Sequence, residues 1–524
     1  MIISIIIDLA IIVINNEIRS HIAGGEKTTV QSARDILKNG GNAFDAAVGA
    51  VFTSMVSECN LTGPGGGGAL LACPVNNDPV LFDFFVDTPP PQPGKELDFF
   101  SVWVDFGPSQ QEFHVGQGSA AVPGNTAGLL KVHERLGQLP LNVVLAPAIA
   151  AARQGIVFNE AQGYINEILE PILTHSESGK TLFAPDGKFL KAGDRFNNPA
   201  FADFMEELIT QGADFFYKGR GSAYILNTVG QSGLLTADCL ANYKVVERVP
   251  LKSRFNGKTI YTNPTPSVGG TLITFTLQLL ERADTASSTD IMNLVRAMQV
   301  TTAARKDSST DPNDNYQISQ ILAENTFERY LEQYRSLQTA AETGNDPPSR
   351  GATTQVSIID KAGNAASVTT TNGEGCGYLI PELGVMLNNM LGEEDLNPSG
   401  FHNFLRQQRL PTMISPTVIM GNDGPELVIG SGGSNRIRSA MIQVILNLMK
   451  NMDLERAIQS SRIHLEGNVL HCEPGIPIHD EHELPDGIQT HQWDEQNLFF
   501  GGVNAVTPEE AVGDPRRGGS GLIC

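Results

Sequence analysis

The sequence predicts an α+β protein that combines amphipathic helices with antiparallel strands. Apolar residues recur with helical spacing in segments such as 129–136 and 141–153. Two strand-like runs, 354–359 and 365–371, flank a short loop that contains Gly363, which is the pattern of a β-hairpin. The chain has 524 residues, 41% of them hydrophobic, which is ample for a large core and excludes a globally disordered chain.

Glycine and proline residues mark where the predicted helices begin and end. A helix over 31–37 stops at Gly40 and Gly41, and a new helix begins at Ala43. Gly137 to Pro140 separates the two helices named above. Further along, the pattern predicts a strand at 258–261 and helices at 269–282, 292–304 and 318–334.

Charge and hydropathy exclude two classes of protein. Lys and Arg total 36 and Asp and Glu total 58, so the net charge is −22, and phosphate backbones would repel such a chain. No stretch reaches the roughly 18 to 20 apolar residues that a membrane span needs. Within residues 1–20, the apolar run Met1 to Ile14 lacks Lys or Arg before Arg19, so either a leader segment or an edge strand fits it. The missing positive start favours a cytoplasmic location over a periplasmic or secreted one.

The cysteine and histidine spacing predicts neither a metal nor a cofactor. No Cys-x-x-Cys pair occurs, so we expect buried free thiols rather than a disulfide scaffold or a zinc ribbon. A group of residues near the C-terminus fits no standard zinc spacing. The cysteines are Cys59, Cys73, Cys239, Cys376, Cys472 and Cys524, and the C-terminal group is His464, His471, Cys472, His479 and His482.

Two glycine-rich turns have different predicted roles. The loop 60–68 ends in four glycines without a following Gly-Lys-Ser/Thr, which favours a close-packed turn over a phosphate cradle. The second turn, 430–434, separates the apolar strand 427–429 from an amphipathic helix, and Ser434 fits an N-cap. Free N–H groups at such a turn can bind an anion, including the oxyanion of acyl transfer. An ordinary strand-to-helix turn is the alternative.

Hairpin register brings two threonines together. If the turn is symmetric about Ala362, paired residue numbers sum to 724, so Thr353 faces Thr371. The segment 342–352 before this strand has the composition of an exposed linker. The strand therefore begins with one threonine beside a second hydroxyl residue, although threonine is also simply a good strand residue.

Several runs occur in an order and spacing typical of one enzyme family. They are 40–48, 62–68, 121–129, 145–148, 353–371, 387–389 and 430–433. Through these runs, from about Ile22 to Gly519, the chain resembles the γ-glutamyltransferase family of N-terminal-nucleophile hydrolases.

The resemblance implies an αββα sandwich of two stacked antiparallel sheets, made as a precursor that cuts itself. The cut would fall between Ala352 and Thr353 and give a large chain 1–352 and a small chain 353–524, which stay associated in one composite domain. Thr353 is then the nucleophile, and its freed α-amine, with a pKa of about 8, is the base. The resemblance assigns Thr371 to the hydrogen bond on the nucleophile and Gly432 and Gly433 to the oxyanion hole. The substrate is a small γ-glutamyl or related amide, and no cofactor is required.

The chain departs from the family at positions that bear on the substrate. Gln355 stands where members usually have histidine, and Phe85 stands where they have the arginine that binds the substrate α-carboxylate. Arg248 and Arg436 are candidates to replace that arginine. The resemblance places substrate binding at Phe85, Asn372, Glu393, Thr412 and Met413.

Two alternatives remain open beside a γ-glutamyltransferase-like enzyme. Phe85 and Met413 make the pocket less polar, which favours an acylase for a different amide, similar to cephalosporin acylases. Gln355 favours a protein of another class, a binding protein that keeps the fold and never cleaves itself.

Overall fold

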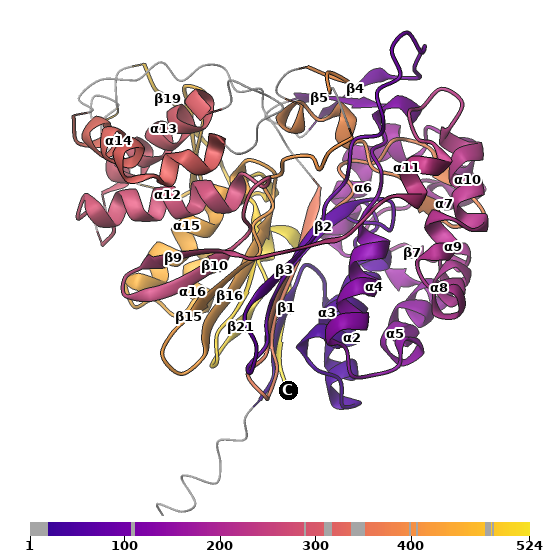
Figure 1. Ribbon diagram of the computed structural model, residues 1–524, viewed down its shortest axis with the longest axis horizontal. Coiled ribbons are helices and arrows are strands. Elements are labelled where there is room, and N and C mark those ends of the chain that lie inside the picture. The colour runs from indigo at the N-terminus through magenta and orange to yellow at the C-terminus, as the bar shows by residue number, and fades with distance from the viewer. Residues whose placement is uncertain are drawn as a thin grey trace, which may run out of the picture.

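The computed structural model describes residues 19–105, 110–287, 290–308, 317–336, 352–397, 400–404, 407–476, 484 and 487–524. Two antiparallel sheets stack face to face in the middle of the molecule, and helices cover the outer face of each (Figure 1). The predicted four-layer αββα arrangement is confirmed.

The first sheet contains the predicted hairpin at its centre. β11 and β12 pair with Thr353 opposite Thr371 and Ile359 opposite Ala365, so the predicted register is confirmed. In spatial order the strands are β22 (Ser520–Ile523), β1 (His21–Gly24), β11 (Thr353–Ile359), β12 (Ala365–Thr371), β2 (Gly67–Cys73), β3 (Val80–Phe84) and β8 (Val246–Arg248). The sheet therefore combines strands from both sides of residue 352, and they are interleaved in its spatial order.

The second sheet packs against β11 and β12 through β16 and β20. Its strands in order are β21 (Ala511–Val512), β20 (Gly502–Val506), β16 (Pro425–Gly432), β15 (Thr417–Met420), β10 (Lys258–Thr262) and β9 (Leu251–Phe255). Smaller pairings join β4 (Phe100–Asp105) with β5 (Gln110–Val115), β6 (Ile156–Val157) with β7 (Arg195–Phe196), β13 (Leu379–Ile380) with β14 (Val385–Met386), and β17 (Ile463–Glu466) with β18 (Val469–Cys472) and β19 (Gln489–Gln492).

Helices of the N-terminal half cover the first sheet, and later helices cover the second (Figure 1). The first group is α2 (Lys27–Lys38), α3 (Ala43–Ser57), α4 (Asn125–Leu136), α5 (Leu141–Gln154), α6 (Glu160–Leu173), α7 (Glu177–Phe183), α8 (Pro199–Gln211), α9 (Asp214–Tyr217), α10 (Arg220–Val229) and α11 (Ala237–Ala241). The second is α12 (Gly269–Arg282), α13 (Ile291–Ser308), α14 (Glu324–Ser336), α15 (Arg436–Met449) and α16 (Leu454–Gln459).

Local predictions and structure differ at two places that concern the site. Ser434 does not cap α15: the N-cap position is Asn435, whose side chain makes no capping hydrogen bond, and Ser434 has a positive φ of 50°. Ala352, the last residue of the predicted exposed linker, is 7% exposed, because it lies against the end of the hairpin. Residues 342–351 and Met1 to Ile14 lie outside the described residues.

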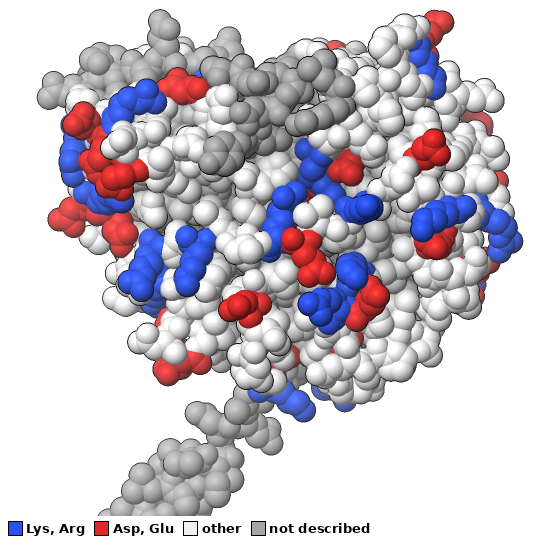
Figure 2. All heavy atoms as spheres, viewed as in Figure 1, with Lys and Arg blue, Asp and Glu red and all other residues white. Residues whose placement is uncertain are grey.

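The glycine run before β2 is a close-packed turn, as predicted. A Cβ on Gly66 would lie 2.0 Å from the carbonyl oxygen of Thr371. On the face in Figure 2, Lys and Arg are interspersed with Asp and Glu rather than gathered into a basic surface. No helix among the described residues is long and apolar enough to cross a membrane.

Candidate active site

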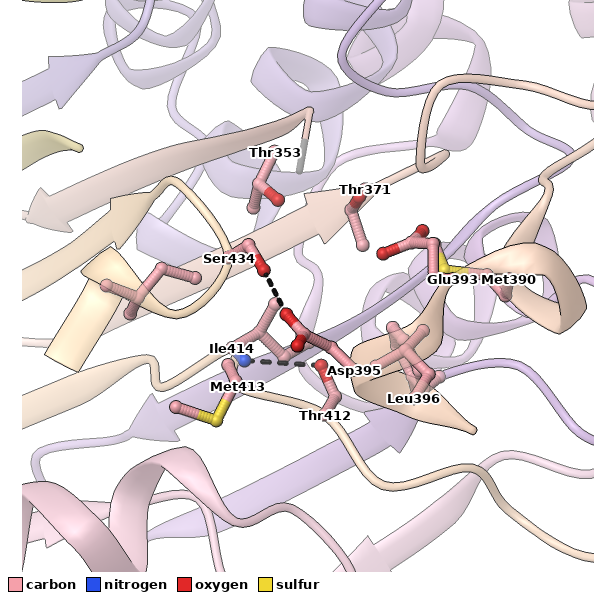
Figure 3. A pocket seen from close by; sticks show the side chains of 12 residues that line it. Thr353, Thr371, Met390, Glu393, Asp395, Leu396, Thr412, Met413, Ile414 and Ser434 are labelled. Carbon is pink, nitrogen blue, oxygen red and sulfur yellow. Dashed lines mark hydrogen bonds between the residues drawn. The ribbon is translucent and has the colours of Figure 1, made fainter. Parts of the chain in front are cut away.

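Thr353 and Thr371 lie side by side at the ends of neighbouring strands and open into a pocket (Figure 3). Both are nearly buried, at 4% and 6% exposure. The pocket is open to solvent, and the space of about 340 Å³ between its walls includes part of that solvent. Its lining consists of Phe85, Thr353, Thr371, Met390, Glu393, Asp395, Leu396, Thr412, Met413, Ile414, Ser434 and Ile437.

The Thr371 hydroxyl is directed at the peptide bond that precedes Thr353. Its Oγ1 accepts a hydrogen bond from the Gly373 N–H at 3.1 Å and donates one to the carbonyl oxygen of Ala352. A donor on this oxygen is suited to stabilise negative charge that develops there when the carbonyl carbon is attacked.

The turn after β16 lies directly against the first residue of β11. A Cβ on Gly432 would lie 2.2 Å from the carbonyl oxygen of Thr353, so only glycine fits this close approach. Gly433 has φ of 122°, which also requires glycine. Ser434 donates from Oγ to Asp395 Oδ2 at 2.9 Å, and this bond fixes the turn at the pocket wall (Figure 3). Gly432 and Gly433 themselves do not line the pocket.

Carboxylates gather at one end of the pocket. The Glu393 side chain points toward Thr371 (Figure 3). Burial raises the pKa of Glu393 well above its usual range, and the neighbouring Glu374 and Asp395 raise it further. Burial likewise raises the pKa of Glu374, whose Oε2 accepts from Asn389 Nδ2 at 3.1 Å. Because Oε1 of both glutamates lacks a hydrogen-bond partner, this end of the pocket is suited to a cationic group.

The remaining predicted substrate positions divide into two groups. Phe85, Thr412 and Met413 line the pocket with Glu393. Asn372 does not; its Nδ2 donates to the Met386 carbonyl at 3.3 Å, behind the pocket wall.

Neither of the two arginines that are candidates to replace the missing clamp lines the pocket. Arg248 Nε pairs with Asp83 Oδ2 at 2.7 Å, and Arg436 Nε donates to the Phe499 carbonyl at 3.1 Å. Arg409, which sequence reasoning did not single out, is the arginine that contacts Phe85, but it does so through the Phe85 carbonyl. No Lys or Arg of the described residues is among those that line the pocket.

Gln355 lies between the two sheets and not in the pocket. It is fully buried, and its Nε2 donates to Ser357 Oγ at 3.0 Å and Ser367 Oγ at 2.9 Å. Its amide therefore satisfies core hydroxyls, and its presence two residues after Thr353 does not argue against catalysis.

The described residues contain no group of three or more His, Cys, Asp or Glu side chains that could hold a metal ion. His464 is buried, with its Nδ1 within hydrogen-bond distance of Ser439 Oγ at 2.7 Å, and burial lowers the pKa of His464 well below the usual range. His479 and His482 lie outside the described residues. All six cysteines are free, four of them buried, and Cys59 and Cys524 are partly exposed.

Sequence reasoning missed several residues in or next to the pocket that only side-chain direction reveals. Glu374, which adjoins the lining carboxylates, follows the hairpin and has no recognisable motif, and the lining residues Met390 and Ile437 have the pattern of ordinary core residues. Asp395 adjoins Glu393 in sequence, which was the one available signal. The remaining unpredicted lining residues are Leu396, Ile414 and Ser434.

Comparisons with known proteins agree with this geometry. A model of the family described as gamma-glutamyltranspeptidase matches residues 29–524. The chain is 29% identical over 469 residues to the glutathione hydrolase proenzyme of Escherichia coli (strain K12), covering 84% of this chain and 80% of the relative. It is 29% identical over 464 residues to the acylase ACY 1 proenzyme of Pseudomonas sp. (strain SE83), covering 84% and 82%.

The fold is shared with a solved acylase. The crystal structure of the cephalosporin acylase from Bacillus halodurans superposes with a TM-score of 0.79 at 20% identity, covering 96% of this chain and 95% of that one. With the family model matched over nearly the whole length, the chain belongs to the gamma-glutamyltranspeptidase family.

Proposed function

We propose that this protein is a γ-glutamyltransferase-like amide hydrolase and acyltransferase that cuts its own precursor between Ala352 and Thr353. Thr353 is the nucleophile of both the cut and the later turnover. The observation that carries the proposal is the contact at the hairpin end: Thr371 donates to the Ala352 carbonyl beside the Thr353 hydroxyl.

Maturation follows from this arrangement. Thr353 Oγ1 attacks the carbonyl carbon of Ala352, and the Thr371 hydroxyl stabilises the charge on the carbonyl oxygen. The C–N bond breaks, the hydroxyl proton passes to the amine nitrogen, and Ala352 is left as an ester on Oγ1. Breaking the C–N bond frees the Thr353 α-amine, and water then hydrolyses the ester, which releases the Ala352 carboxylate and restores the Thr353 hydroxyl. The products are the large chain 1–352 and the small chain 353–524.

Turnover uses the group that maturation released. The free α-amine, with a pKa of about 8, accepts the proton of Thr353 Oγ1 as the oxygen attacks a substrate amide. The leaving amine takes that proton, and an acyl-enzyme remains. Water then gives hydrolysis, and an amine gives transpeptidation. In this scheme the Gly432–Gly433 turn supplies N–H groups to the oxyanion, which its contact with Thr353 supports.

The pocket supports an acyl donor that carries an ammonium group, such as a γ-glutamyl group. Glu393 and Asp395 line the pocket, and Glu374 adjoins them. A cation would relieve the mutual repulsion of these carboxyls. Among the described residues nothing cationic lines the pocket to bind a substrate carboxylate.

An acylase for a less polar donor is the second candidate, because six of the twelve lining side chains are apolar. They are Phe85, Met390, Leu396, Met413, Ile414 and Ile437. A hydrophobic acyl chain would bury surface against them at roughly 25 cal/mol per Å².

Three anilides separate the two candidates. γ-Glutamyl anilide carries both charged groups, 4-aminobutyryl anilide lacks the carboxylate, and butyryl anilide lacks both. We expect both amine-bearing anilides to be hydrolysed faster than butyryl anilide. Faster hydrolysis of butyryl anilide would favour the acylase.

The number of chains seen on a denaturing gel tests whether Thr353 is the nucleophile. We expect the native protein to separate into two chains on a denaturing gel, and Thr353→Ala to stay a single inactive 524-residue chain. Thr371→Val should slow cutting by on the order of 10²-fold because it removes the donor to the Ala352 carbonyl, and Thr371→Ser should restore it. A native protein that never cuts would support the non-catalytic binding protein instead.

A further inference from the structure

A five-residue turn behind the pocket joins the ends of both central strands. This turn, Glu58–Thr62, follows the last residue of α3. Thr354 Oγ1 donates to Glu58 Oε1 at 2.7 Å, and Thr62 Oγ1 donates to Thr370 Oγ1 at 2.8 Å. Because strand side chains alternate, Thr354 and Thr370 face this turn while Thr353 and Thr371 face the pocket.

The Glu58 carboxyl is closely enclosed. Glu58 is 1% exposed, and a Cβ on Gly25 would lie 2.0 Å from Oε1. Thr29 Oγ1 donates to Oε2 at 3.4 Å. Burial raises the pKa of Glu58 to about 8, while the buried Arg517 guanidinium opposes that rise. The acceptor of the Thr354 hydroxyl is thus held in one position.

The same region of β11 has little support from its neighbour on one side. The register of β1 against β11 ends at Gly24 opposite Val356, so Thr353 to Gln355 extend beyond the β1 pairing. On the proposed function, the cut makes Thr353 a free chain end, and chain ends fray unless other contacts hold them. The Thr354 side chain supplies such a contact next to the nucleophile.

We propose that Glu58 is a positioning residue, which orients Thr353 through its hydrogen bond to Thr354. Thr62, through Thr370, holds Thr371 in the same way, so one turn sets the relative position of the two pocket hydroxyls. Displacing a reacting group by about 1 Å can cost on the order of 10²-fold in rate, which is why the support matters. The inference rests on the proposed function of Thr353.

The test compares Glu58→Ala, Glu58→Gln, Thr354→Val and Thr354→Ser in the full 524-residue chain. Precursor cutting is followed on a denaturing gel. The values of kcat and KM are measured with γ-glutamyl anilide at a temperature below the unfolding temperature of every variant. We expect Glu58→Ala and Thr354→Val to slow cutting and lower kcat by on the order of 10- to 100-fold, with KM within about twofold. Glu58→Gln and Thr354→Ser each keep the hydrogen bond and should recover most of the rate.

Thr301→Val is the matched control. It removes a buried threonine–threonine hydrogen bond of 2.8 Å, to Thr276, in the helical layer behind the second sheet. It should lower the unfolding temperature comparably and leave cutting and kcat unchanged.

The outcomes distinguish the two proposals. Unchanged cutting and kcat in Thr354→Val, or loss of folding in Thr354→Val and Glu58→Gln alike, would overturn the positioning role while Thr353 remains the nucleophile. If Thr353→Ala itself is still cut and active, the proposed function fails first.

Discussion

Among single residues, Phe85 and Glu393 bear most directly on substrate recognition. Phe85 presents a buried ring, 2% exposed, where a carboxylate-binding arginine was expected from the resemblance. Glu393 presents a buried carboxyl that lacks a partner on Oε1. The role of each of these two side chains in substrate recognition can be tested by one substitution.

Replacing Phe85 tests the missing carboxylate clamp. An arginine–carboxylate pair is bidentate and charge-assisted, which a phenyl ring cannot reproduce. We expect Phe85→Arg to lower KM for γ-glutamyl anilide by roughly 5- to 150-fold and to leave KM for 4-aminobutyryl anilide unchanged. Phe85→Leu is the control for lost ring packing. A native KM in the low micromolar range that Phe85→Arg makes worse would show that this position is not a lost clamp.

The raised pKa of Glu393 predicts how stability depends on pH. Because the folded-state pKa lies above the unfolded value, the native state binds more protons above about pH 4.5, and stability falls as pH rises through this window. Each unit of pKa difference corresponds to roughly 1.4 kcal/mol. In an uncut Thr353→Ala background, Glu393→Gln should match the parent near pH 5 and unfold a few degrees higher near pH 8. An unfolding-temperature difference that does not grow between these pH values would contradict the assignment.

At the scale of elements, the site depends on how closely the β16 turn approaches β11. The turn carries no side chain at Gly432, and the carbonyl of Thr353 occupies the space where one would lie. A strand-to-helix turn of this kind is common in α/β proteins, so its local sequence alone does not distinguish an oxyanion site from a connection. The contact with the nucleophile residue makes that distinction.

Adding one methyl group to this turn should disrupt catalysis. A Cβ on Gly432 would lie 2.2 Å from the Thr353 carbonyl oxygen, whereas one on Gly63 would make an ordinary contact of 3.6 Å with Asn372 Oδ1. We expect Gly432→Ala to lower precursor cutting and kcat by more than about 100-fold, and Gly63→Ala to change them by less than about threefold. Normal cutting of Gly432→Ala would exclude a role for this turn at the nucleophile.

At the scale of the whole molecule, the proposed cut divides the chain without dividing the fold. Strands β11, β12 and β22 of the small chain alternate with β1, β2, β3 and β8 of the large chain in one sheet. Separating the two chains would break ladders on several strand edges and expose the apolar space between the sheets.

The two product chains should therefore behave as one particle. We expect them to elute together at the size of the 56.3 kDa precursor on a gel-filtration column and to separate only in denaturant. The uncut Thr353→Ala protein is the size control. Elution of the small chain alone under native conditions would show that the composite domain does not hold.

Features that depend on neighbouring residues could be predicted from the sequence. Antiparallel pairing across a short turn is local, so the symmetry about Ala362 was enough to place Thr353 opposite Thr371. Helix α12 begins at Gly269 and ends at Arg282, as its spacing predicts. The four-layer sandwich, by contrast, followed from the family resemblance, because periodicity does not reveal how sheets stack.

Which distant side chains come into contact depends on how the strands and helices pack. Thr354 and Glu58 are 296 positions apart in the chain, and nothing in either local pattern links them. Gln355 replaces a histidine that is usual in the family, which suggested lost catalysis, yet its side chain points between the two sheets and donates to Ser357. Serine commonly caps helices, but the Ser434 hydroxyl donates a hydrogen bond to Asp395. In each case side-chain direction and packing across the sandwich fixed the partner, and a linear sequence does not carry that information.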